Sequence, residues 1–192
     1  FTDTIYYHDA DGIYVNLFLA SELTWPEKKF RLRQETGFPS EAETHFSVHC
    51  ESLTHLVLNL RIPAWVAEGG SVSLNGNKLE VFARPSSYLS LSRTWHDGDR
   101  IDLNLPMQLH SEPLLGSPIL RVAMYAPLVL AGLYPGQKAP AGATIGAFSA
   151  RPTGWPSPAS APELYTKQWT NIDWVERVSG ASLSFRTVHQ AT

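Results

Sequence analysis

Cys50 carries the only thiol of the sequence, and a thiolate can act as a nucleophile or as a metal ligand. The alternating pattern around it places Cys50 on the same strand face as Phe46 and Val48, which predicts a position facing the core. Buried cysteines mostly behave as small hydrophobic side chains, so the pattern favours packing over catalysis. A single cysteine also excludes an internal disulfide and a zinc site built from cysteines of this chain alone.

Histidines and aspartates are the other groups that could hold a metal. His45 and His49 share a face of one predicted strand and His55 follows closely, but their spacing matches no metal motif, so a solvated face is favoured. Four aspartates flank glycines in two loops: Asp9, Asp11, Asp97 and Asp99. Such loops either bind calcium or form ordinary turns. Turn formation is favoured, because neither loop has the ligands of a complete calcium-binding loop.

Hydrolysis of a glycosidic bond normally needs two carboxylates, one on each side of the sugar. Several glutamates could supply such groups, but no spacing pairs them: Glu22, Glu27, Glu35, Glu41 and Glu43. Glu35 lies on a predicted strand with Arg31 and Arg33, which predicts ion pairing. We therefore assign no catalytic, cofactor-binding or metal-binding residue to this chain.

Two of the six tryptophans are candidates for the surface: Trp25, which precedes Pro26, and Trp95, which lies in a predicted turn. An exposed indole can stack on a sugar ring, and it can equally pack against another domain. The domain interface is the favoured role, and carbohydrate contact is the alternative.

The composition indicates a folded protein and argues against two classes of partner. Hydrophobic residues make up 43%, and the net charge is −3 from 15 basic and 18 acidic residues with no basic stripe. Nucleic acid and an anionic membrane surface are therefore poor partners. The N-terminus has neither the starting Met nor the basic and apolar regions of a signal peptide, so we expect a soluble piece of a longer protein whose compartment stays open.

Hydrophobic residues alternate with polar ones in short segments over the first two-thirds of the chain, which predicts about ten strands and no crossover helix. The clearest hairpin joins 71–74 to 78–81 through Asn75-Gly76, because both residues tolerate the positive φ of a type I′ turn. We predict an all-β fold, an antiparallel β-sandwich or jelly roll, over 1–134. A Pro/Gly/Ala-rich linker or long loop follows over 135–162, and 163–192 is an extension with one strand at 183–187 that begins a truncated region.

Four segments then become informative together: 11–17 (DGIYVNL), 32–39 (LRQETGFP), 58–65 (LNLRIPAW) and 126–132 (APLVLAG). In this order and spacing, over roughly 5–132, they resemble glycoside hydrolase family 127, the β-L-arabinofuranosidase-like enzymes. The hairpin at 72–77 and the turn at 94–99 fit the same pattern. The family usually has Gly where this chain has Ala126.

The resemblance implies that this chain is one domain of a larger bacterial enzyme whose active site lies in another domain. It places the active site in an N-terminal helical barrel, with a cysteine nucleophile near a zinc held by cysteines and a glutamate. The matched region is the middle β-sandwich, so we expect a non-catalytic accessory domain without cofactor. The zinc and the activity on L-arabinofuranosides or related sugars would belong to the missing catalytic domain.

The partners expected on this basis are the missing helical domain and plant-type or other glycans. Self-association through the exposed domain interface is also expected. The alternative function is a carbohydrate-binding module, and a stand-alone enzyme with an unrecognised site is the least favoured.

Overall fold

The computed structural model describes residues 4–116, 121–131, 172–180 and 183–188. The regular elements of this part are strands, with one short 3-10 turn at Pro26–Lys28. The all-β prediction is therefore confirmed. None of the helical segments described is long or apolar enough to cross a membrane.

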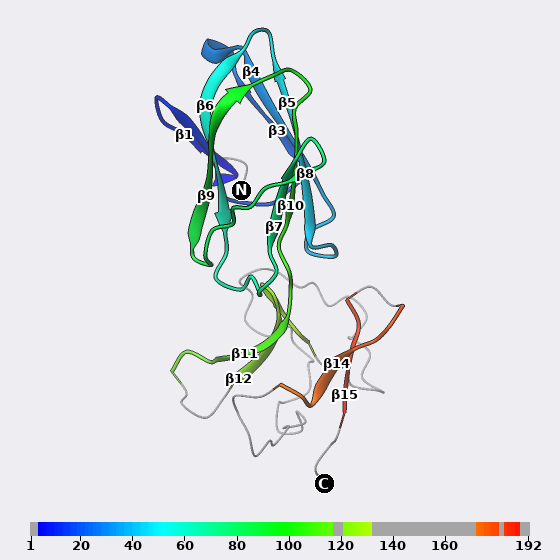
Figure 1. The fold of residues 1–192 in the computed structure, drawn as a ribbon. Coiled ribbons are helices and arrows are strands. Elements are labelled where there is room, and N and C mark those ends of the chain that lie inside the picture. The colour runs from blue at the N-terminus through cyan, green and yellow to red at the C-terminus, as the bar shows by residue number, and fades with distance from the viewer. Residues whose placement is uncertain (1–3, 117–120, 132–171, 181–182, 189–192) are drawn as a thin grey trace, which may run out of the picture.

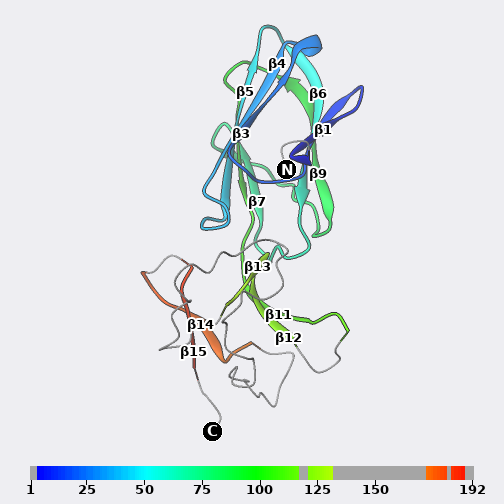
Figure 2. The same ribbon diagram turned by 180° about the vertical axis from the view of Figure 1, so that it is seen from behind.

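Two sheets face each other and form the sandwich (Figures 1 and 2). The four-stranded sheet has the order β1 (Tyr6–His8), β2 (Gly12–Val15), β6 (Thr54–Ile62) and β9 (Ser87–Trp95). The six-stranded sheet has the order β3 (Ser21–Trp25), β4 (Phe30–Thr36), β5 (Glu43–Cys50), β10 (Arg100–Asn104), β7 (Ser71–Leu74) and β8 (Asn77–Lys78).

The core fills the space between these sheets. Alternate residues of every long strand point inward, because side chains of a strand alternate between its two faces. The inward residues of β6 are at most 2% exposed at Leu56, Leu58, Leu60 and Ile62. Phe30, Leu32, Phe46 and Val48 close the core from the other sheet at 0–1% exposure. The period-2 pattern of the sequence thus marks the buried face correctly.

The Asn75-Gly76 hairpin forms with the predicted turn, but its second strand is the two-residue β8, Asn77–Lys78, rather than 78–81. Both residues have positive φ, 50° at Asn75 and 79° at Gly76, and Leu74 pairs with Asn77 across the turn. A two-residue turn of this hand matches the twist of the strands that it joins. Pro106 lies beyond the end of β10, where its missing N–H interrupts no hydrogen bond of the sheet.

Three features differ from the sequence prediction. The alternating hydrophobic pattern, which predicts one strand, continues from Ile13 to Leu19, but β2 ends at Val15 and the chain then crosses to β3 in the other sheet. Gln34 fixes this crossing, because its buried amide Nε2 donates to the carbonyl oxygens of Leu17 at 3.1 Å and Leu19 at 2.6 Å. The edge strand β3 was not predicted. The pairing of β2 with β6 is parallel, whereas the other pairs of the sandwich are antiparallel.

The parallel pairing of β2 with β6 requires a glycine at position 12. Gly12 faces Val57, and a Cβ at Gly12 would lie 2.6 Å from the Val57 carbonyl oxygen. We expect Gly12→Ala to lower the free energy of unfolding by about 1–3 kcal/mol, because the backbones must separate. Urea denaturation measures this. Ser92→Ala, an exposed change opposite Val57 on β9, is the control and is expected to cost no more than about 0.5 kcal/mol.

Beyond the sandwich, two small sheets contain the remaining described strands. One has the order β11 (Leu109–Pro113), β12 (Arg121–Tyr125) and β13 (Leu128–Val129), and the other pairs β14 (Val175–Arg177) with β15 (Phe185–Thr187). The predicted strand at 183–187 is present as β15, and it has a partner, β14, which was not predicted. The rings of Tyr125 and Phe185 lie 5.1 Å apart, so these two sheets touch. The predicted linker at 135–162 lies outside the described residues.

Candidate functional site

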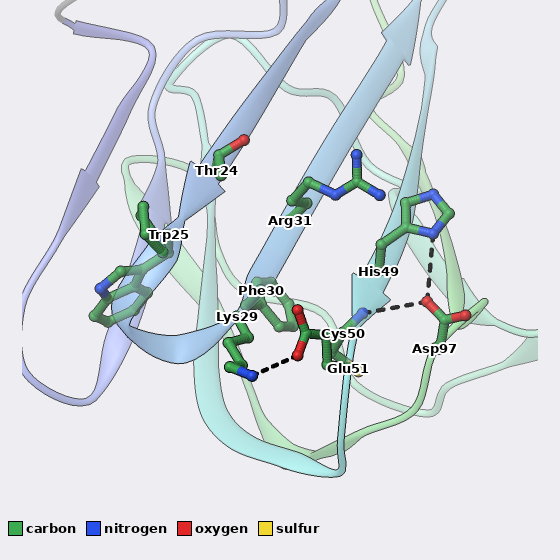
Figure 3. Close-up of a pocket in the computed structure, with 10 residues that line it drawn as sticks. Thr24, Trp25, Lys29, Phe30, Arg31, His49, Cys50, Glu51 and Asp97 are labelled. Atoms are coloured by element: carbon green, nitrogen blue, oxygen red, sulfur yellow. Dashed lines mark hydrogen bonds and ion pairs between the residues drawn. The ribbon is translucent and has the colours of Figure 1, made fainter.

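An open depression of about 700 Å³ lies at one end of the six-stranded sheet (Figure 3). Its floor is a cross-strand row of outward side chains, because Thr24 of β3 pairs with Arg31 of β4 and Arg31 pairs with His49 of β5. The loop residue Asp97 adjoins this row, and six further residues line the depression: Trp25, Pro26, Lys29, Phe30, Cys50 and Glu51. We call this depression the edge groove.

Each ionisable side chain that lines the edge groove, cysteine apart, contacts a side chain of the opposite type, basic with acidic. Lys29 Nζ lies 2.5 Å from Glu51 Oε2, and this hydrogen bond raises the pKa of Lys29. His49 Nδ1 lies 3.3 Å from Asp97 Oδ1, and Arg31 reaches Glu22 at 3.7 Å. Asp97 Oδ1 also accepts a hydrogen bond from the backbone N–H of Cys50 at 3.2 Å. The groove therefore offers polar contacts, and its two carboxylates are already engaged.

Cys50 has the packing role that its strand phase predicts. The thiol packs against the core and points toward the Trp95 carbonyl oxygen, 3.7 Å away. Burial raises the pKa of the Cys50 thiol, and the negative charges of Asp97 and Asp99 raise it further. A thiol that stays protonated at neutral pH is a poor nucleophile.

We expect Cys50 to react with a thiol-specific disulfide reagent far more slowly at pH 7.5 than free cysteine does. The rate should rise by about tenfold when urea unfolds the chain, because unfolding removes both the burial and the two nearby carboxylates. Absorbance of the released thiolate measures both rates. Equal rates for the folded chain and free cysteine would contradict the packing role.

The expected exposure of the two candidate tryptophans is wrong. Trp95 is 0% exposed, and its indole Nε1 donates to the Leu56 carbonyl oxygen at 3.1 Å, so its ring offers no face to a sugar. Trp25 is 7% exposed, with the His8 ring 4.5 Å away and Lys28 Nζ 5.6 Å from its centroid. The apolar phase of β3 and β9 turns both side chains inward. Trp25 still lines the edge groove, and its interface or carbohydrate role stays a prediction.

The aspartates that flank glycines organise turns. Asp9 Oδ1 accepts hydrogen bonds from the backbone N–H groups of Asp11 at 2.9 Å and Gly12 at 2.8 Å, and Oδ2 accepts one from the Tyr14 hydroxyl at 3.1 Å. These bonds hold the pKa of Asp9 below its ordinary value. This is the geometry of an Asx turn, which explains the pattern without an ion.

Asp99 joins the Asn75-Gly76 turn to the turn that connects β9 with β10. Its Oδ1 accepts from Asn75 Nδ2 at 2.8 Å, and its Oδ2 accepts from the His96 backbone N–H at 3.0 Å. Burial raises the pKa of Asp99, but these bonds and the charges of Arg93 and His96 outweigh it, so the pKa is lower than its ordinary value. Asp99 is thus an ionised, buried group that stabilises the fold.

The histidines of β5 lie on the solvated face that was predicted. His45 is half exposed and lies 2.7 Å from Asp102 Oδ1, which belongs to the neighbouring strand β10. Glu35 forms the predicted ion pair with Arg33 at 2.6 Å. Within the described ranges, no three His, Cys, Asp or Glu side chains are grouped closely enough to hold a metal ion. The chain therefore supplies no described ligand set for the zinc that the resemblance implies.

The sequence analysis missed a second surface, on the outer face of the four-stranded sheet. Tyr7 and Tyr88 are exposed there, at 49% and 40%, and Tyr14 is half-buried between them. Their outward phase is readable from the strand pattern, but their proximity depends on pairings between strands far apart in the sequence.

A family model described as the middle domain of GH127 β-L-arabinofuranosidase matches residues 12–107, which is half of the chain. The chain belongs to this family. The match covers both sheets of the sandwich except β1, and it includes the edge groove.

Solved structures of the GH127 family share the fold. A GH127 β-L-arabinofuranosidase from Geobacillus stearothermophilus T6 is 26% identical with a TM-score of 0.58, over 66% of this chain and 21% of its own. A protein described as a glycoside hydrolase is 28% identical with a TM-score of 0.58, over 65% of this chain and 22% of its own. The GH127 β-arabinofuranosidase BT3674 is 26% identical with a TM-score of 0.54, over 65% of this chain and 23% of its own. Among curated proteins, none matches the chain.

The chain thus spans about a fifth of the length of these solved relatives. The similarity concerns a GH127 middle domain rather than a whole enzyme.

Proposed function

We propose that this chain is the non-catalytic accessory sandwich of a glycoside hydrolase that acts on β-L-arabinofuranosides, and that it supports a separate helical catalytic domain. The observation that carries the proposal is the match to a GH127 middle domain together with the small share of each solved relative that the chain covers. The catalytic chemistry, including any zinc, belongs to the remainder of the longer enzyme.

The roles of the carboxylates in the sandwich support this division. A retaining or inverting glycosidase needs two carboxyl groups that face one sugar and are free to take part in proton transfer or attack. Here Asp9 organises a turn, Asp99 is buried among donors, and Asp102 accepts from Ser73 at 3.0 Å while it contacts His45. These carboxylates stabilise the fold through hydrogen bonds that a catalytic role would break.

The test compares two polypeptides on 4-nitrophenyl β-L-arabinofuranoside. One is the 192-residue chain, and the other is a longer polypeptide in which a GH127 catalytic domain precedes it. We expect release of nitrophenol from the longer polypeptide alone. Hydrolysis by the 192-residue chain, at a rate that scales with its concentration, would contradict the non-catalytic role.

A support role makes a further prediction within the longer polypeptide. Destabilising the sandwich by Gly12→Ala should lower the temperature at which activity is lost, while KM at 25 °C stays unchanged, because no substrate contact is removed. Ser92→Ala is the matched control. A changed KM with an unchanged inactivation temperature would show a direct role in substrate binding instead.

A further inference from the structure

The outer face of the four-stranded sheet carries one continuous row of side chains across all four strands. Tyr7 of β1 pairs with Tyr14 of β2, Tyr14 pairs with Asn59 of β6, and Asn59 pairs with Ser90 of β9. Directly paired residues project to the same side of a sheet. This side points away from the six-stranded sheet (Figure 2).

A second, shorter row lies beside the first, where Arg61 of β6 pairs with Tyr88 of β9. Tyr14 and Tyr88 come from strands that flank β6, yet their ring centroids are only 5.5 Å apart at an interplanar angle of 89°. Because strands two apart in a sheet are separated by about 9–10 Å, both rings must lean toward each other over β6. We call the surface formed by the two rows the tyrosine face: Tyr7, Tyr14, Asn59, Arg61, Tyr88 and Ser90.

Hydrogen bonds hold two of the three rings, those of Tyr14 and Tyr88, in place. The Tyr88 hydroxyl donates to Asn16 Oδ1, and the Tyr14 hydroxyl donates to Asp9 Oδ2 at 3.1 Å. The Arg61 guanidinium donates to the Asn16 carbonyl oxygen at 3.4 Å. A surface whose rotamers are already fixed loses little conformational entropy when a ligand binds.

The centre of the tyrosine face offers a hydrogen-bond donor. Asn59 accepts from the Ser90 hydroxyl through Oδ1 at 2.6 Å, and within the described ranges its Nδ2 has no hydrogen-bond partner. Asn59 is only 7% exposed, and Gly12 adds no side chain over that nitrogen, since a Cβ there would lie 3.3 Å from it. The small exposed edge of Asn59 beside Tyr14 is where a ligand hydroxyl would accept.

We propose that the tyrosine face binds an uncharged glycan that contains L-arabinofuranose. Aromatic rings supply contact area for the C–H groups of a sugar ring, and the hydroxyl and amide groups between them match sugar hydroxyls. The choice of L-arabinofuranose rests on the proposed function. The site lies on the sheet opposite to the edge groove, so it is separate from the surface near Trp25.

Two observations favour a glycan over a docked protein domain. The centres of protein interfaces are usually apolar, whereas the centre of the tyrosine face is the amide of Asn59 beside the Ser90 hydroxyl. The face also has a single charged side chain, Arg61, whose guanidinium already donates to the Asn16 carbonyl oxygen at 3.4 Å. Most of its polar groups are therefore uncharged hydroxyls and amides, which match the hydroxyls of a neutral glycan.

The test titrates the 192-residue chain with a β-linked L-arabinofuranose trisaccharide, followed by calorimetry and by amide chemical shifts. We expect saturable binding with a dissociation constant of about 1 mM or tighter, and shifts concentrated in β1, β2, β6 and β9. Polygalacturonate should not compete. Tyr7→Ala and Tyr88→Ala should each weaken binding about tenfold, and Tyr7→Phe should retain it because the ring remains.

Leu53→Ala is the matched control, since Leu53 is 66% exposed and lies outside the tyrosine face. Failure to bind at about ten times the expected dissociation constant, by a chain with a folded amide spectrum, overturns the proposal. Binding that Tyr7→Ala and Tyr88→Ala leave unchanged also overturns it, because the sugar then binds elsewhere. Self-association that Tyr88→Ala abolishes, without sugar binding, would identify a protein contact instead. None of these failures affects the hydrolysis test, which decides the accessory role separately.

Discussion

Replacing Trp95 with alanine is expected to lower the free energy of unfolding by about 3–5 kcal/mol, the largest effect of any single substitution in the sandwich. The indole is fully buried between the sheets, and Arg93 lies over it at 5.2 Å from the ring. Alanine would leave a cavity and would also leave the Leu56 carbonyl oxygen without its indole donor. Urea denaturation followed by circular dichroism measures the loss without relying on tryptophan fluorescence.

Two further substitutions separate packing from other roles. Trp95→Phe keeps a large apolar ring, and it loses the hydrogen bond and part of the buried volume, so it should cost clearly less than alanine does. Tyr88→Ala removes an aromatic side chain of the same sheet that is 40% exposed, and it should cost less again. If Trp95→Ala cost no more than Tyr88→Ala, the core position of Trp95 would be contradicted.

The buried faces of the sandwich could be predicted from the sequence because alternation is a local signal. Leu56, Leu58, Leu60 and Ile62 occupy every second position of one segment, and the structure buries all four. The Asn75-Gly76 turn is local in the same sense, since two residues determine its type. Local patterns therefore gave the fold class and the clearest hairpin.

The pairing of strands could not be predicted in this way, because it depends on contacts between distant segments. Nothing in the sequence of β2 shows that it runs parallel to β6, some 45 residues later. The edge strand β3 escaped prediction because only its inward residues Leu23 and Trp25 are apolar and its other positions are polar. Trp95 was placed in a turn because the glycine and aspartates that follow it mark one, yet it is the last residue of β9.

The candidate sites show the same limit. The edge groove gathers Thr24, Arg31 and His49, which lie far apart along the chain and meet only through the pairings of β3, β4 and β5. The tyrosine face gathers Tyr7 and Tyr88 from opposite ends of the sandwich sequence. Each tyrosine is visible in the sequence as an outward position, but the surface exists only in the assembled sheet.

Replacing Asp99 with asparagine should lower the free energy of unfolding at pH 7 by about 2–3 kcal/mol. The carboxylate accepts from two donors, Asn75 Nδ2 and the His96 N–H, one at each oxygen. Asparagine of the same shape offers one oxygen and one NH₂ group, so one donor must face another donor. Asp97→Asn, the same change at a 67% exposed carboxylate of the same loop, is the matched variant and should cost less.

The pH dependence of this difference tests the charge on Asp99. Its folded pKa is lower than its ordinary value, so the carboxylate contributes stability that is fully present above the unfolded pKa of about 3.9. That contribution is lost as the pH falls through the folded pKa, whereas Asp99→Asn has no such carboxylate to lose. The difference in free energy of unfolding between the wild-type chain and Asp99→Asn, measured by urea denaturation, should therefore have its full value at pH 7. It should decrease progressively below about pH 4. If this difference stayed constant down to the lowest pH at which the chain still folds, Asp99 would act through shape and hydrogen bonding alone, without its charge.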